Sequence, residues 1–192
     1  AFHFDTGILG AKALYNVLSE NGQHETAWAM LMQTSQPSYG YWIEQVAPPL
    51  WEQWRGANSR NHIMFGDIGA WFYKNLAGLN IDAGSAESVA FGHFVLRPRL
   101  IDGLSYVDAS VQSIRGKIGS SWKVDGNRMQ WTVEIPANTT ATVYIPAADA
   151  ASITESGKPV AQVAGLTFVG QEGGYDVYKV PSGRYQFPSK IR

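Results

Sequence analysis

The stretch SYGYWIEQVAPPLWEQWRG, residues 38–56, places aromatic rings beside two carboxylates, Glu44 and Glu52. The block Asn58-Ser-Arg-Asn-His62 follows and ends in a histidine. Sugar rings have apolar C–H faces that lie on aromatic rings, and carboxyl groups catalyse the hydrolysis of glycosidic bonds. The stretch has no helical or strand period and contains Pro48-Pro49, so we expect one long loop over residues 38–62. Its length and composition favour a functional loop that binds carbohydrate.

On the N-terminal side of this loop, apolar residues recur at helical spacing. One helix is predicted between Asp5-Thr6, which can cap its start, and Asn21-Gly22, which can end it. A second is predicted from His24 through Gln33, and a third from about Phe65 to Asn75. Three helices cannot close a core around so aromatic a loop, so we expect this half to be a piece of something larger.

From about Ser88 the apolar period changes to two, which is typical of half-buried strands. Residues Met129–Ile135 alternate apolar and polar side chains, and Asp125-Gly126-Asn127 before them predicts a hairpin. Further short strands are expected near residues 89–97, 106–114, 140–145, 166–169, 174–180 and 184–187. The pattern predicts an α + β protein in two parts, residues 1–82 helical and residues 83–192 an antiparallel β-sandwich.

Composition narrows the classes of function. The 192 residues are 45% hydrophobic and 16% charged, with a net charge of −1 and no cysteine. This balance gives no electrostatic reason to bind nucleic acid or a membrane, and no apolar run reaches transmembrane length. Histidine and acid spacings do not match a zinc site, and nucleotide-binding motifs are absent, so we expect no metal and no cofactor. The expectation is a soluble protein whose compartment, whether cytoplasmic, periplasmic or secreted, stays open.

The residues alone leave two interpretations of each candidate. Glu52 is either a catalytic base or a loop glutamate bonded to backbone amides, and Glu44 is the competing carboxylate or an acid that supports the loop. His62 either binds a sugar hydroxyl or packs at a helix start. Trp42, Trp51 and Trp54 either form a stacking wall for a sugar or belong to the core.

Several blocks, in this order along the chain, resemble the C-terminal third of family 78 α-L-rhamnosidases. They are Asp5-Thr-Gly-Ile-Leu-Gly, Ser38-Tyr-Gly-Tyr-Trp-Ile-Glu-Gln, Leu50-Trp-Glu-Gln-Trp-Arg-Gly, Asn61-His62, Trp71-Phe-Tyr with Leu76-Ala-Gly, and Ile135-Pro-Ala-Asn-Thr-Thr-Ala. Two departures stand out. Val46-Ala-Pro-Pro-Leu replaces a Gly-Ala-Thr-Thr-like run, and the link from Trp54 to Asn61 is short.

The resemblance implies the last hairpins of an (α/α)6 barrel followed by a C-terminal β-sandwich. It implies that Glu52 is the general base of an inverting enzyme and that Asn61 and His62, with the nearby tryptophans, bind rhamnose. The family's general acid lies upstream of the matching region. The expected partners are therefore a rhamnose-containing glycoside or polysaccharide and the remainder of the same enzyme chain. Two rival hypotheses are a non-catalytic carbohydrate-binding module and a purely structural fragment.

Overall fold

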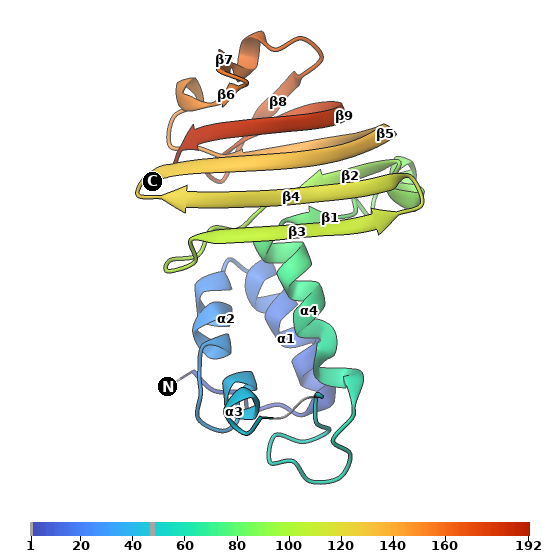
Figure 1. The fold of residues 1–192 in the computed structure, drawn as a ribbon, viewed down its shortest axis with the longest axis vertical. Helices are drawn as coiled ribbons and strands as arrows, with labels where there is room; N and C mark the ends of the chain where they lie inside the picture. Colours follow the sequence, from blue (N-terminus) through green and yellow to red (C-terminus); the bar gives the residue numbers. More distant parts are fainter. Residues whose placement is uncertain (1, 47–48) are drawn as a thin grey trace. The chain divides into compact units, whose positions relative to one another are not determined.

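A computed structural model describes residues 2–46 and 49–192, so Ala47 and Pro48 of the predicted loop lie outside the described residues. The chain divides into two compact units, Ala1–Phe72 and Tyr73–Arg192. The first is helical and the second is built on a β-sheet (Figure 1). The predicted fold class, helices followed by a mostly antiparallel β domain, is confirmed.

The three predicted helices of this half are found with different ends, and a further short helix lies within the predicted loop. The helices are α1 (Ile8–Glu20), α2 (His24–Leu31), α3 (Tyr39–Glu44), the 3-10 helix η1 (Ile63–Gly66) and α4 (Asp67–Trp71), which continues as the π-helical turn η2 (Phe72–Leu76). None of the helices in the described ranges is long and apolar enough to cross a membrane.

Two local predictions in this unit are wrong. Gly7 is the N-cap of α1, and no side chain caps that helix, so Asp5 and Thr6 do not have the predicted role. The first part of the predicted loop is helical, because Ser38 Oγ accepts a hydrogen bond from Tyr41 N (2.9 Å) and so begins α3. Serine at an N-cap followed by six helical residues is too short a pattern to show a helical period.

Aromatic rings fill the core of the helical unit. Tyr39 and Trp54 lie 5.4 Å apart between ring centroids, and Trp54 lies 4.3 Å from Phe65. Trp71 is fully buried, and its indole Nε1 donates to Ser19 Oγ at 2.8 Å. These contacts between α1, α3 and the segment around η1 hold the loops of this unit in place.

The second unit contains one seven-stranded sheet in the order β1-β2-β5-β4-β3, with β9 paired to β5 and β8 paired to β9. The strands are β1 (Leu79–Asn80), β2 (His93–Leu96), β3 (Tyr106–Ser113), β4 (Gly116–Asp125), β5 (Arg128–Pro146), β8 (Thr167–Glu172) and β9 (Tyr175–Lys190). A small second sheet pairs β6 (Thr154–Glu155) with β7 (Lys158–Pro159). Short 3-10 helices lie between strands: η3 (Ala86–Phe91), η4 (Ala150–Ser152) and η5 (Val160–Gln162).

The predicted hairpin is confirmed, since Asp125 pairs with Arg128 around a two-residue turn. The strands predicted at 129–135 and 140–145 are instead one strand, β5, with a register shift between Ile135 and Thr140. The strands predicted at 174–180 and 184–187 likewise form the single strand β9 (Figure 1). The predicted strand 89–97 is confined to β2, which pairs parallel to β5, because η3 occupies the residues before it.

Both halves of β5 contribute to a single apolar core, in which Val133, Ile135, Val143 and Ile145 are buried. A bend in long strands at such an irregularity lets one hydrogen-bonded sheet enclose a core from two sides. The last helical turn is fixed within this unit, because the carbonyls of Leu76 and Ala77 accept from Trp122 Nε1 (2.8 Å) and Ser120 Oγ (2.6 Å).

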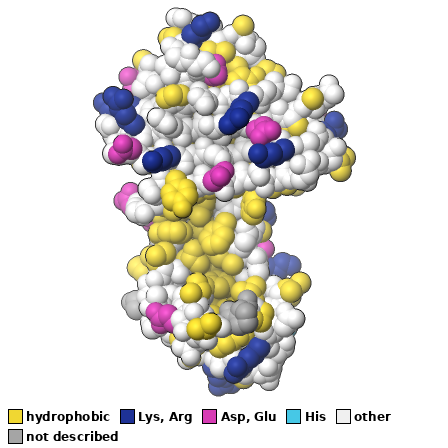
Figure 2. Space-filling view, in the orientation of Figure 1, with side chains coloured by type: hydrophobic (Ala, Val, Ile, Leu, Met, Phe, Trp, Pro, Cys, Tyr) yellow, Lys and Arg dark blue, Asp and Glu magenta, His cyan; other side chains and the backbone are white. Residues whose placement is uncertain are grey.

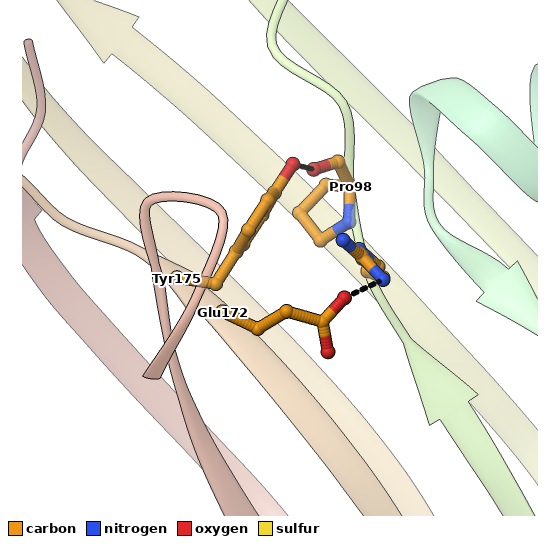
Figure 3. A network of polar contacts seen from close by, with 4 residues as sticks. Pro98, Glu172 and Tyr175 are labelled. Carbon is orange, nitrogen blue, oxygen red and sulfur yellow. Dashed lines mark hydrogen bonds and ion pairs between the residues drawn. The ribbon is translucent and has the colours of Figure 1, made fainter. Parts of the chain in front are cut away.

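A polar network joins the end of β2 to the β8–β9 hairpin (Figure 3). Arg97 forms an ion pair with Glu172 at 2.9 Å, and its guanidinium lies over the rings of Tyr144 (4.6 Å) and Tyr175 (5.2 Å). Tyr175 OH donates to the carbonyl of Pro98 at 2.9 Å. Because the guanidinium lies over one face of each ring and also pairs with Glu172, these tyrosines help to pack the sheet unit.

Candidate functional site

Glu52 lies in the loop that follows α3, on the wall of a hollow of about 510 Å³. The other walls come from the segment before α1 and from the segment between α2 and α3. Polar groups on the walls include Asp5, Gln36 and Arg55, and the apolar lining includes Trp54 and Phe65. A hollow with an aromatic lining and convergent polar groups suits a pyranose ring.

The loop around Glu52 is closed by a pair of hydrogen bonds with Ser59. Glu52 N donates to Ser59 O at 2.8 Å, and Ser59 N donates to Glu52 Oε2 at 3.1 Å. Within the described residues, Oε1 has no hydrogen-bond partner. The carboxylate is therefore held by one oxygen, and the other oxygen is free to accept a proton.

The three candidate tryptophans have different environments. Trp54 is half-buried and lines the hollow, and its Nε1 donates to the carbonyl of Thr6 at 2.9 Å. Trp42 and Trp51 are buried. Trp42 Nε1 donates to Trp54 O at 2.9 Å, and the ring of Trp51 lies 5.0 Å from the guanidinium carbon of Arg60. The contacts of Trp42 and Trp51 favour the core interpretation, in which both rings hold the loop that carries Glu52.

Asn61 and His62 lie just before η1 and are absent from the described residues that line the Glu52 hollow. Asn61 is exposed, and His62 N donates to Leu50 O at 2.8 Å. The imidazole Nδ1 of His62 is buried and has no hydrogen-bond partner in the described part of the chain. A buried polar atom without a partner is costly, so this imidazole is a group for which a ligand or a further protein segment would supply a partner.

Glu44 is not among the described residues that line the Glu52 hollow, and instead lines a second, apolar groove of about 670 Å³ in the helical unit. Met32, Ile43 and Phe72 line this groove, and Ile43 is 76% exposed. Figure 2 shows hydrophobic side chains gathered over the helical unit. Apolar surface of this extent is typical of an interface with further protein rather than of a free surface.

The described residues contain no group of three or more histidine, aspartate or glutamate side chains arranged to hold a metal ion. The hollow also contains residues that the sequence did not mark as site candidates, namely Asp5, Gln36, Gln53 and Arg55. Asp5 belongs to one of the blocks that carry the family resemblance, which is the signal that could have indicated it.

Two family descriptions match successive parts of the chain. Residues 1–76 match the bacterial α-L-rhamnosidase six-hairpin glycosidase domain, and residues 81–159 match the bacterial α-L-rhamnosidase C-terminal domain. The chain belongs to the bacterial α-L-rhamnosidase family. The first match covers the helical unit, and the second covers the part of the sheet unit that contains β2 to β7.

Individual rhamnosidases match over nearly the whole chain. An α-L-rhamnosidase of Streptomyces avermitilis is 32% identical over 97% of this chain. The crystal structure of the Streptomyces avermitilis α-L-rhamnosidase complexed with L-rhamnose superposes on 98% of this chain with a TM-score of 0.86. The structure of the Dictyoglumus thermophilum α-L-rhamnosidase, which is 30% identical, superposes on 98% of this chain with a TM-score of 0.85. The chain spans only 18% and 21% of these two structures, respectively.

Proposed function

We propose that this chain is part of an inverting glycoside hydrolase that releases terminal α-L-rhamnose from glycosides or polysaccharides, with Glu52 as the general base. One observation carries the proposal. In a chain of the rhamnosidase family, the only glutamate on the described wall of an aromatic-lined hollow is held through Oε2 and keeps Oε1 free. The structure of the Streptomyces avermitilis relative complexed with L-rhamnose supports rhamnose as the sugar.

In the proposed reaction, Glu52 Oε1 accepts a proton from a water molecule on the face of the sugar opposite the leaving group. The water oxygen bonds to the anomeric carbon as the glycosidic C–O bond breaks. A second carboxyl group, about 6.5–9.5 Å away in inverting enzymes, protonates the leaving oxygen. We assign that acid to the remainder of the enzyme chain. The hydrogen bond from Ser59 N keeps the Glu52 carboxylate oriented while its free oxygen gains the proton.

Substrate binding is proposed for Trp54 through its ring and for Asn61 and His62 through hydroxyl contacts. Trp51 and Trp42 are proposed to support the sugar site from behind Trp54. The remaining hairpins of the six-hairpin domain are proposed to cover the apolar groove around Ile43. We use the term complete enzyme for this chain joined to those hairpins.

The test is the stereochemistry and substrate range of the complete enzyme. We expect it to hydrolyse 4-nitrophenyl α-L-rhamnoside, and proton NMR should detect the β anomer of rhamnose first, before mutarotation. The matched 4-nitrophenyl α-L-fucoside should be a poor substrate. The 192-residue chain alone should be inactive, because the proposed general acid lies in the remainder of the enzyme chain. First release of the α anomer, or robust turnover by the isolated chain, would show that the proposed division of roles is wrong.

A further inference from the structure

Asp5 lies on the wall of the same hollow as Glu52, although the two residues are far apart in the sequence. From the proposed function, on which this step rests, we infer that Asp5 binds ring hydroxyls of the rhamnose unit and so determines which sugar is accepted. The ligand class is a pyranose with neighbouring free hydroxyls. The contribution is to substrate affinity, and Glu52 keeps the chemical step.

Asp5 has no structural role in the described part of the protein. It does not cap α1, whose N-cap is Gly7 without any side-chain hydrogen bond. Its exposed side chain forms no ion pair and accepts no hydrogen bond from the described residues. Its exposed carboxylate therefore keeps all its acceptor sites for a ligand in the hollow.

The backbone on both sides of Asp5 is fixed. Phe4 is buried, and its ring centroid lies 4.7 Å from that of Trp54. The carbonyl of Thr6 accepts the hydrogen bond from Trp54 Nε1 at 2.9 Å. Because Trp54 belongs to the same loop as Glu52, these contacts also fix the Asp5 backbone relative to the base. A binding group on a backbone held in this way loses little entropy when the ligand binds.

The polar side chains on the walls of the hollow also favour Asp5 as the group that binds sugar hydroxyls. The other polar groups on its walls include the Gln36 and Gln53 amides and the Arg55 guanidinium, which can offset the charge of two carboxylates. Hydrogen bonds from hydroxyls to an ionised acceptor are shorter and stronger than those to a neutral amide. With Trp54 under the apolar face of a ring, Asp5 is the charged acceptor available for its hydroxyl edge.

The test is Asp5→Asn in the complete enzyme, with Glu20→Gln, an exposed acid at the far end of α1, as the matched control. We expect KM for 4-nitrophenyl α-L-rhamnoside to rise about 10- to 100-fold in Asp5→Asn, with little change in kcat. The affinity for free L-rhamnose, measured by calorimetry, should fall by a similar factor. Glu20→Gln should change neither quantity.

Substrates that each lack one ring hydroxyl locate the contact. Removing the hydroxyl that Asp5 binds should raise KM in the wild type, and Asp5→Asn should then add little further change. Unchanged KM and unchanged rhamnose affinity in Asp5→Asn would overturn the inference, as would a large loss of kcat at constant KM. Glu52→Gln, assayed alongside, distinguishes a failure of the proposed function from a failure of the inference about Asp5. If it keeps wild-type turnover, the proposed function fails, whereas the calorimetric result for Asp5 needs no turnover and is decided independently.

Discussion

Two buried phenols in the helical unit differ in one respect that stability measurements can detect. Tyr39 OH donates to the carbonyl of Phe65 at 2.7 Å, whereas Tyr15 OH is buried without a hydrogen-bond partner in the described part of the chain. Both side chains are more than nine-tenths buried, at 8% and 1% exposure. Replacing each by phenylalanine removes one oxygen and leaves the ring packing in place, so the two variants compare a used hydroxyl with an unused one.

Tyr39→Phe removes a donor from the buried Phe65 carbonyl, and leaving such a group unpaired costs about 1–3 kcal/mol. Tyr15→Phe removes a hydroxyl whose desolvation is not offset by any described hydrogen bond, so it should leave stability unchanged or raise it by about 1 kcal/mol. The two variants should therefore differ by about 1–4 kcal/mol, with Tyr39→Phe the less stable.

The assay is urea denaturation of the complete enzyme, followed by near-ultraviolet circular dichroism, which reports on packed aromatic rings. Wild type and both variants are measured at the same protein concentration. A Tyr15→Phe variant that loses more than about 1 kcal/mol would show that this hydroxyl has a partner in the complete enzyme. Equal stability of Tyr39→Phe and wild type would refute the assignment of the Phe65 hydrogen bond.

Burial, reinforced by the neighbouring Tyr39 for Tyr15 and by nearby Asp67 for Tyr39, raises the pKa of both phenols well above the usual value of 10.0. The folded state then keeps protons that the unfolded chain loses above about pH 10. These two phenols together should therefore lower the free energy of unfolding by up to about 2.7 kcal/mol per pH unit there, and Tyr39→Phe should remove about half of that contribution. Denaturation series on both sides of pH 10 measure this slope; an equal slope in both proteins would contradict the prediction. Gly78→Ala should lower the free energy of unfolding by about 3 kcal/mol or more in thermal denaturation, because φ is +77° and a Cβ would lie 2.2 Å from Pro98 N. Gly103→Ala, with open space around it, should lower it by about 1 kcal/mol. Similar losses of stability in both variants would contradict this prediction. His62→Ala should weaken L-rhamnose binding by about 1–3 kcal/mol in calorimetry, and unchanged affinity would assign His62 to packing.

Local signals made part of the fold predictable. The hairpin around Gly126 could be predicted because a two-residue turn and the alternation of Met129–Ile135 lie within one short window. The continuity of β5 could not, because Pro136 and Asn138 read as strand breakers. In the folded sheet they lie at the register shift, where pairing with β9 on both sides carries the strand past them. Long-range pairing of this kind leaves no periodic trace in the sequence.

The same limit applies to the site. Glu52 and the neighbouring tryptophans could be proposed as site residues from one contiguous stretch of sequence. Which of the tryptophans line the hollow and which belong to the core depends on which rings the helices cover. Trp54 lines the hollow, while Trp42 is buried behind it. An acid before a helix is a common capping pattern, so the sequence predicts Asp5 as a helix cap, whereas Gly7 is the N-cap of α1. Its place opposite the Glu52 loop follows only from the Trp54–Thr6 hydrogen bond and the aromatic contacts of Phe4.

The proposed reaction depends most on Glu52, and the turnover of Glu52→Gln in the complete enzyme tests that role most directly. The substitution keeps the shape of the side chain and removes the proton acceptor, so kcat should fall by about 10²–10⁴-fold while rhamnose affinity stays near that of the wild type. Glu44→Gln, which alters the carboxylate at the edge of the apolar groove, should keep a kcat close to that of the wild type. A Glu52→Gln enzyme that keeps more than about a tenth of wild-type turnover, or a Glu44→Gln enzyme that loses it, would contradict the account.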